Sequence, residues 1–320
     1  MTMELTAPFP YFGGKRRAAP MIWDALGDPG GYVEPFAGSA AVLLARPRMT
    51  GRRVETINDA DGWLVNAWRA IQLSPSEVAA HAHGPVTEID YHARLAWLQE
   101  RRTPDLASWL EGDPEAHDPK AAAWWLYVCA CGIGDPWGPG PWRVVDRHLR
   151  DTRHLGNAGR GVNRELPHLG DAGKLDGYVH ALAMRLARVR ITCGDWQRVL
   201  KPSVIRATAG NSTIGVLLDP PYSTSGDLYA TTNTGQHQDI SAQVREWATD
   251  NGTNYRIVLC GFDDEHDELL GHGWRKEIGR AGGGAGYNTD GRAGRRERLW
   301  LSPSCVETAL ALDFTEEVSP

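Results

Sequence analysis

The chain lacks the sequence features of several common classes of protein. It has no apolar run long enough to cross a membrane, and no apolar signal core follows its first methionine. Its five cysteines include no CxxC pair and lie mostly in apolar segments, which favours reduced core thiols over disulfides or a metal site. We therefore expect a cytoplasmic protein with no metal and no membrane contact.

Two further absences narrow the function. The chain contains no GxGxxG pattern, which makes a dinucleotide-dependent oxidoreductase a remote alternative. Its net charge of −6 argues against indiscriminate binding of polyanions, although it does not exclude a local basic face. What is present is ordinary for a globular protein, with 42% hydrophobic and 23% charged residues among 320. This length suffices for one large α/β domain and a smaller inserted one.

Short apolar strands alternate with helical patterns in the first and last parts of the chain. Strands are expected at 32–34, 54–58, 189–193, 215–218, 256–261 and 298–302, and helices at 61–71, 88–102, 120–131, 175–189, 241–251 and 263–270. The pattern predicts a Rossmann-like α/β sheet with helices on both faces and an inserted, mostly helical and loop segment. We divide the chain into a first sheet half at 1–83, an insertion at 84–188 and a second sheet half at 189–320.

The loops of the first sheet half form a candidate cofactor site. The stretch YFGGK brings two glycines, which permit close approach to a ligand, together with a cation. After the first strand comes an acid, then a turn of small residues and an apolar helix, which suits a nucleoside-type ligand with a cationic amino acid end better than a pyrophosphate. A plain helix-start loop remains the alternative for YFGGK. The residues of this candidate site are Tyr11, Lys15, Glu34, Pro35, Phe36 and Gly38.

Two later strand ends carry further candidate cofactor residues. Asp59 ends the second strand, where an acid typically binds ribose hydroxyls, while Asp61 fits the N-cap of the next helix. Asp195 and Trp196 follow the strand 189–193, and an acid beside an aromatic ring can pair with and cover a flat heterocycle. An ordinary turn at Gly194 is nearly as good an interpretation.

The stretch GVLLDPPYSTSG, from Gly215 to Gly226, is the most informative in the chain. An apolar strand delivers Asp219, Pro220, Pro221 and Tyr222 to the carboxyl edge of the sheet, and the prolines make this loop rigid. The Asp219 carboxylate and the Pro220 carbonyl are two acceptors beside one aromatic face. Such a group fits an exocyclic amino group on a planar base, although a proline-rich turn that merely closes a strand is equally consistent with four residues.

The long segment from Gly132 to Gly173 is rich in glycine, proline and arginine and is predicted to be an irregular functional loop. Between 141 and 164 it has six arginines against two aspartates, a local charge of +4 in an acidic chain. We interpret it as a nucleic-acid surface, with a solvated charged loop as the alternative. Its candidate residues are Arg143, Arg147, Arg150, Arg153, Asn157, Arg160, Asn163 and Arg164. A second basic rim, at 275–298, has seven basic residues against Glu277, Asp290 and Glu297.

Five motifs, in this order, give the chain a family resemblance. They are YFGGK, EPFAGSAAV, IND, GDW and DPPY, and they resemble those of the Dam-like S-adenosylmethionine-dependent DNA N6-adenine methyltransferases, particularly phage-borne members. The resemblance implies that Tyr11 and Lys15 contact the cofactor. It also implies that residues 34–38 line its methionine end, that Asp59 binds its ribose, and that Asp195 and Trp196 bracket its adenine. The family usually has glycine where Ala40 stands, and the middle segment offers no match that can be transferred residue by residue.

The resemblance also implies a reaction. An adenine flipped out of double-stranded DNA would be held by Asp219, Pro220 and Tyr222, and its N6 would take a methyl group directly from S-adenosylmethionine. We expect a site-specific enzyme that works as a monomer or weak dimer, with a role in restriction–modification and, if phage-encoded, in the host cytoplasm. Two alternatives stay open: methylation of cytosine N4, and a catalytically silent DNA-binding protein on the same scaffold.

Overall fold

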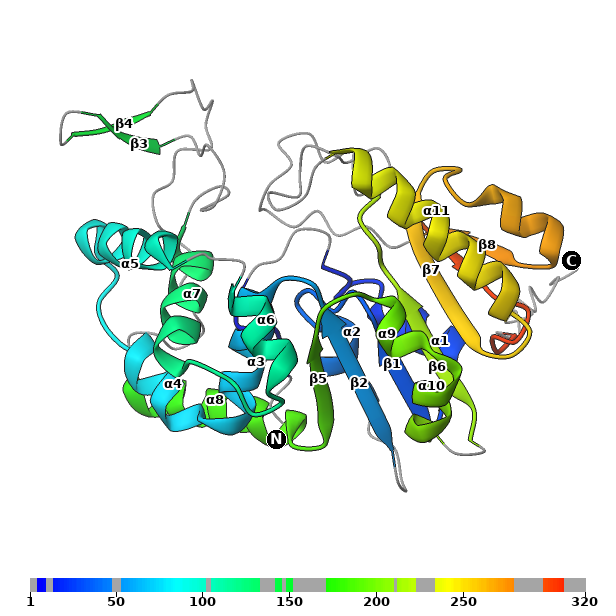
Figure 1. Cartoon of the computed structure of the whole chain (residues 1–320), viewed down its shortest axis with the longest axis horizontal. Coiled ribbons are helices and arrows are strands. Elements are labelled where there is room, and N and C mark those ends of the chain that lie inside the picture. The colour runs from blue at the N-terminus through cyan, green and yellow to red at the C-terminus, as the bar shows by residue number, and fades with distance from the viewer. Residues whose placement is uncertain are drawn as a thin grey trace, which may run out of the picture.

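The computed structural model of the chain describes residues 5–9, 14–47, 53–101, 105–132, 142–145, 148–151, 171–209, 212–222, 234–278 and 296–307. Its centre is a seven-stranded sheet in the order β5-β2-β1-β6-β7-β9-β8 (Figure 1). These strands are β5 (Val189–Cys193), β2 (Val54–Asp59), β1 (Gly31–Glu34), β6 (Ile214–Leu218), β7 (Arg256–Phe262), β9 (Glu297–Leu301) and β8 (Arg275–Ile278). The first five are parallel, and β9 runs antiparallel to both of its neighbours.

The central strands are buried on both faces, as their continuous apolar runs predict. Every residue of β1 and β6 is buried. Side chains alternate between two separate hydrophobic clusters: Tyr32 and Leu217 belong to one, while Val33 and Val216 belong to the other. The two clusters are the two sides of the sheet, so the predicted Rossmann-like α/β fold, with helices on both faces, is confirmed.

The helices divide between these two sides. Those that contribute to the larger cluster are α1 (Ala19–Leu26), α2 (Ala41–Leu44), α3 (Gly62–Leu73), α4 (Pro75–Ala82), α5 (Glu88–Glu100), α6 (Asp105–Gly112), α7 (Pro119–Cys131) and α8 (Ala172–Leu186). The smaller cluster lies under α9 (Gln197–Leu200), α10 (Pro202–Ala209), α11 (Thr234–Asn251) and the 3₁₀ helix η1 (Asp267–His272). Figure 1 shows α4, α5, α7 and α8 gathered beyond the β5 edge and α11 in front of β7. No helix in the described part of the chain has the length and apolar character needed to span a bilayer.

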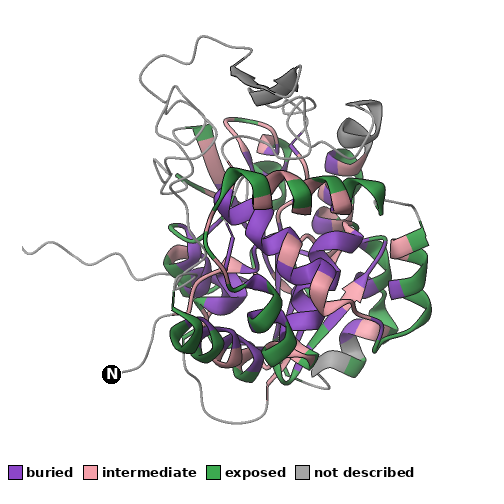
Figure 2. Ribbon diagram, turned by 90° about the vertical axis from the view of Figure 1, so that its left-hand side faces the viewer, coloured by how far each residue is buried: buried purple, intermediate pink, exposed green. Residues whose placement is uncertain are grey.

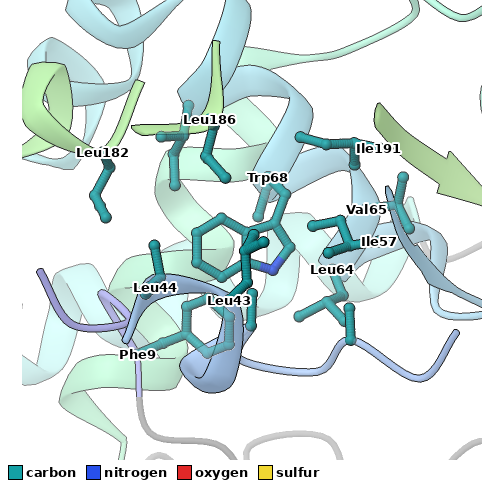
Figure 3. Packing of buried hydrophobic residues seen from close by; sticks show 14 of the residues in the cluster. Phe9, Leu43, Leu44, Ile57, Leu64, Val65, Trp68, Leu182, Leu186 and Ile191 are labelled. Atoms are coloured by element: carbon teal, nitrogen blue, oxygen red, sulfur yellow. The ribbon is translucent and has the colours of Figure 1, made fainter. Parts of the chain in front are cut away.

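The larger cluster runs without interruption from the sheet into the middle segment. Figure 2 shows buried residues on the inner sides of the strands and helices, and exposed residues on their outer sides. At its centre Trp68 of α3 lies among Phe9, Leu43, Leu182 and other apolar side chains (Figure 3), and its ring centroid is 5.5 Å from that of Phe9. The Trp68 indole donates a hydrogen bond of 3.0 Å to the Gly38 carbonyl. The core therefore holds the turn after β1 directly.

Several predicted boundaries were wrong. The helix expected at 241–251 begins at Thr234, so Ser241 does not cap it; Ser241 is buried and donates to the Glu265 carboxylate at 2.8 Å. The helix expected at 263–270 is the 3₁₀ helix η1, at Asp267–His272. The helices α4, α6, α9 and α10 and the strand β8 were not predicted. Two strands, β3 (Trp142–Val145) and β4 (His148–Asp151), form an antiparallel pair inside the segment predicted to be irregular. Asp61 does cap α3, by accepting from the Trp63 amide at 2.9 Å, as predicted.

Candidate functional site

The loops that follow β1, β2, β5 and β6 meet at the carboxyl edge of the sheet, because these strands are parallel neighbours. Asn58, at the end of β2, ties three of them together. Its amide nitrogen donates to the Pro35 carbonyl at 3.1 Å and to the Gly194 carbonyl at 2.9 Å, and its amide oxygen accepts from Thr192. Asn58 was not among the predicted site residues, although an amide at a strand end was a signal for one, and the structure buries it.

Asp59 is held in one orientation by backbone donors. One carboxylate oxygen accepts from the Gly38 amide at 3.0 Å and the other accepts from the Asp61 amide at 2.9 Å. Burial raises the pKa of Asp59 to about 6, although these amides favour its charged form. A carboxylate oxygen can accept more than one hydrogen bond, which hydroxyl binding by Asp59 requires.

Glu34 is a buried carboxylate with a neutral partner. It is 3% exposed, and the Tyr32 hydroxyl donates to it at 3.0 Å. Burial raises the pKa of Glu34 to about 8; the Tyr32 hydrogen bond opposes this shift and the nearby Asp219 charge adds to it. In the described part of the chain, Glu34 forms no ion pair.

The turn between Glu34 and α2 contains two residues in the left-handed region. Gly38 has φ 47° and Ala40 has φ 48°. The first is easy for glycine, whereas the second is uncommon for a residue with a Cβ. The position at which the family motif usually has glycine thus adopts a conformation that suits glycine, and Ala40 is fully buried there.

Two aromatic residues predicted to bind the cofactor lie together. The rings of Phe36 and Trp196 are 5.8 Å apart at 32°, with Trp196 buried and Phe36 half-buried. Asp195 is exposed, and its carboxylate accepts from the Gln197 amide at 2.8 Å. The predicted cofactor residues between Glu34 and Trp196 therefore share one edge of the sheet.

A network of two carboxylates, one ammonium and one phenol lies beside them. The Lys15 ammonium is 2.8 Å from Asp219 Oδ2 and 2.9 Å from Glu297 Oε1. The Tyr222 hydroxyl donates to Asp219 Oδ1 at 3.0 Å and lies 3.3 Å from Glu297 Oε1. Lys15 was predicted at the cofactor and is found here against the DPPY stretch, while Glu297 was counted only as a charge of a basic rim. Contact across the sheet, rather than nearness in sequence, brings Glu297 to this network.

The DPPY loop is packed tightly. Pro220 is buried and Pro221 half-buried. The Tyr222 ring is 3% exposed, lies edge-on to Phe262 with centroids 4.4 Å apart, and has the Lys15 ammonium 5.3 Å from its centroid. Stacking of Tyr222 on a base therefore requires this ring to be uncovered.

Most of the predicted DNA-contacting residues lie outside the described residues, as does Tyr11. These are Arg147, Arg153, Asn157, Arg160, Asn163 and Arg164. Arg143 and Arg150 lie on β3 and β4, where the register places them opposite each other.

A separate groove of about 1080 Å³ lies between α1, α2 and α8, away from the DPPY loop. Five arginines line it, but Arg46 and Arg185 pair with Glu55, and Arg53 pairs with Asp28. These charges connect α2 and α8 to β2 and thereby stabilise the fold.

The arrangement fits a cofactor that combines a cation with a nucleoside. Glu34 is a buried carboxyl group without a cationic partner in the described chain, Asp59 is held in one orientation, and the half-buried Phe36 ring packs on Trp196 beside them. Next to them, Asp219 can accept from an amino group. The described residues contain no group of three or more potential metal ligands.

Comparison with known protein families identifies a match in the first part of the chain. Residues 11–86 match the family described as D12 class N6 adenine-specific DNA methyltransferase. The matched region runs from the YFGGK motif through β1, β2 and α3, and so covers the Glu34 turn and Asp59. No curated protein matches the chain in sequence.

Proposed function

Since the chain is a Dam-like DNA methyltransferase of the D12 class, which methylates adenine at N6 with S-adenosylmethionine as donor, we propose that its Asp219, Pro220 and Tyr222 hold the target adenine. The observation that supports this proposal best is the position of Asp219. Asp219 lies on the loop next to the Glu34 turn, accepts a hydrogen bond from Tyr222 and forms an ion pair with Lys15. A carboxylate and a carbonyl so placed can accept the two N–H groups of one amino group.

We propose the following roles for the cofactor residues. Glu34 faces the cationic methionine end, Asp59 accepts from the ribose hydroxyls, and Phe36 with Trp196 covers the adenine ring. Tyr11 and Asp195 are further contacts suggested by the family motifs. S-adenosylmethionine supplies a methyl group activated by its positive sulfur.

The reaction places specific demands on the chain. The N6 lone pair of adenine is delocalised into the ring, so acceptors at Asp219 and Pro220 assist by drawing the two N–H groups out of the ring plane. N6 then forms a bond to the methyl carbon while the carbon–sulfur bond breaks and its electron pair stays on sulfur. One proton leaves N6 to the Asp219 carboxylate and passes on to water.

Replacement of Asp219 tests this assignment. Asp219→Ala should retain binding of S-adenosylmethionine and lose methyl transfer by about 10³-fold, the scale of loss of one transition-state contact in a dry site. The measurement is incorporation of labelled methyl groups into DNA, followed by nucleoside analysis. Wild-type turnover in the variant would remove Asp219 from the mechanism, and N4-methylcytosine in the digest would favour the cytosine alternative.

The recognition of DNA is proposed on the sequence alone. We propose that 84–188 selects a specific site in double-stranded DNA and that the arginines between 143 and 164 contact phosphates, with Asn157 and Asn163 available to bases. Removal of the charges of Arg153, Arg160 and Arg164 together should weaken the binding of DNA. The number of counterions released on binding, measured from the dependence of affinity on salt concentration, should fall by up to about three. We further propose that the enzyme acts in the cytoplasm, where its DNA substrate lies, as a monomer or weak dimer.

A further inference from the structure

The geometry points to Glu297 as a positioning residue for methyl transfer: it is a second carboxylate that retains the Lys15 ammonium and the Tyr222 hydroxyl while Asp219 engages the target amino group. This inference rests on the proposed role of Asp219. Neither the family match, which ends at residue 86, nor the sequence motifs assign any function to Glu297.

Both hydrogen-bond donors of the network are shared between the same two carboxylates. Lys15 lies within 2.9 Å of an oxygen of each, and the Tyr222 hydroxyl lies 3.0 Å from Asp219 and 3.3 Å from Glu297. The side chains are shielded from water, with exposed fractions of 4% for Lys15, 20% for Asp219 and 16% for Glu297. In such surroundings these charge-assisted contacts are stronger than on an open surface.

The sheet fixes Glu297 in this place. It is the first residue of β9, in register with Phe262 of β7, and the Phe262 ring packs on the Tyr222 ring. Since β6, β7 and β9 are successive strands, the loop after β6 and the start of β9 face each other across the end of β7. Glu297 thus reaches the DPPY loop from a strand that is paired within the sheet.

The need for a second carboxylate follows from the acceptors of Asp219. In this structure one oxygen of Asp219 accepts from Tyr222 and the other accepts from Lys15. An adenine amino group must compete with these donors for the same carboxylate. Glu297 already contacts both donors, so they can move toward it without losing a partner, and Asp219 becomes available.

Charge leads to the same conclusion. Burial lowers the pKa of Lys15, but the carboxylates of Asp219 and Glu297 outweigh burial and hold that pKa well above its usual value, so Lys15 stays charged. One ammonium between two carboxylates leaves a net negative charge beside the base. That charge stabilises the positive charge that develops on N6 as the methyl group arrives.

The test compares Glu297→Gln with a matched control in single-turnover methylation of duplex DNA. Glutamine keeps the shape and an acceptor for Tyr222 but removes the charge that holds Lys15. We expect a 10- to 100-fold lower rate of transfer, on the order of the loss of one charged contact, with the affinity for S-adenosylmethionine changed by less than about threefold. Glu55→Gln, which breaks the pairs of Glu55 with Arg46 and Arg185 near the opposite end of β2, should lower the melting temperature without a lower rate.

The pH profile separates positioning from simple support of the fold. The charge of Glu297 contributes to a raised pKa of Asp219, mainly caused by burial. Removal of that charge should lower the pKa of Asp219, so the acid limb of the pH–rate profile should move toward lower pH. A loss of folded enzyme would instead reduce the rate by the same factor at every pH. Glu297→Asp, which restores a carboxylate, should recover part of the rate.

Each outcome decides the question. A wild-type rate and profile in Glu297→Gln, with Asp219→Ala inactive, would refute the role of Glu297 and leave the proposed function intact. Activity in Asp219→Ala would instead remove the premise. If Glu297→Gln is unstable, a double-mutant cycle of Lys15→Met, Glu297→Asp and their double variant decides the question instead. A double variant that is no slower than Lys15→Met supports the proposal that Glu297 acts through Lys15. Fully additive losses of rate contradict that proposal.

Discussion

Glu34 shows how a single residue prepares the site for a cation. Its pKa of about 8 means that the free enzyme holds this carboxyl protonated at neutral pH. A bound sulfonium and amino group would favour the carboxylate, so binding should release a proton. The heat of S-adenosylmethionine binding at pH 7 should therefore depend on the ionisation enthalpy of the buffer, and Glu34→Gln should bind more weakly without that dependence. A buffer-independent heat in the wild type would show that Glu34 does not face the cation.

The same residue affects stability with a definite sign. Between its unfolded pKa of 4.5 and its folded pKa of about 8, the folded state binds one proton more than the unfolded state, so stability falls as pH rises through this range. Glu34→Gln removes this penalty and keeps an acceptor for Tyr32. We expect the unliganded variant to match the wild type near pH 4.5 and to exceed it by on the order of 3 kcal/mol at pH 7. Urea unfolding at several pH values measures the difference; a constant difference would contradict the assignment.

Ala40 tests whether backbone strain is stored in the cofactor turn. The left-handed conformation of an alanine costs roughly 1 kcal/mol of stability, and glycine avoids this cost. Glycine in turn lowers stability, because it lacks the buried methyl group and has more conformational freedom in the unfolded state. Ala40→Gly should therefore be nearly neutral in free energy of unfolding. The control Ala67→Gly, in the middle of the buried helix α3, should cost at least about 1 kcal/mol more. Equal losses in chemical denaturation would show that the turn carries no strain.

Among the elements, the ends of β1, β2 and β5 depend on Asn58. Asn58→Ala removes the hydrogen bonds that Asn58 donates to the carbonyls of Pro35 and Gly194. We expect the free energy of unfolding to fall by about 1–3 kcal/mol as a result. Because these loops carry the cofactor residues, the affinity for S-adenosylmethionine should fall about tenfold as well.

A second buried asparagine supplies the control for this prediction. Asn66 of α3 bonds to the backbone of Asp118 before α7, away from the cofactor loops. Asn66→Ala should destabilise the protein to a similar degree with cofactor affinity preserved. Equal losses of affinity in both variants, measured by calorimetry, would mean that Asn58 acts only through general stability.

At the scale of the whole molecule, the middle segment and the sheet share one core. Residues of α7 such as Leu126 and Tyr127 lie in the same buried cluster as Trp68 and Ile57. In urea, we expect the helices of 88–131 and the sheet of the wild type to unfold in one transition. Fluorescence and circular dichroism monitor this transition. Leu126 is 1% exposed, so Leu126→Ala should lower the free energy of unfolding by about 2–5 kcal/mol. The midpoint of the whole transition should therefore move to a lower urea concentration. A separate early transition would instead identify 84–131 as an independent domain.

The sequence by itself determined the class of the molecule. Apolar strands alternating with helices predicted the Rossmann-like sheet, because burial on both faces demands continuous apolar runs. The order of the five motifs indicated the reaction, and the acids at strand ends were identified because parallel strands end at one edge. The hydrophobic pattern is local, and the reaction follows from the resemblance of the motifs to a known family, so no contact between distant segments was needed.

Only the tertiary structure decided which charges act together. Lys15, Asp219 and Glu297 are far apart in sequence, and the order β6-β7-β9 brings the last two to one ammonium. Asn58 likewise bonds to loops from β1 and β5. The start of α11 and the β3–β4 pair were missed because their sequences are polar or rich in turn residues, and local pattern is weak there. Electrostatic partners depend on distance through space, and a single sequence shows only distance along the chain.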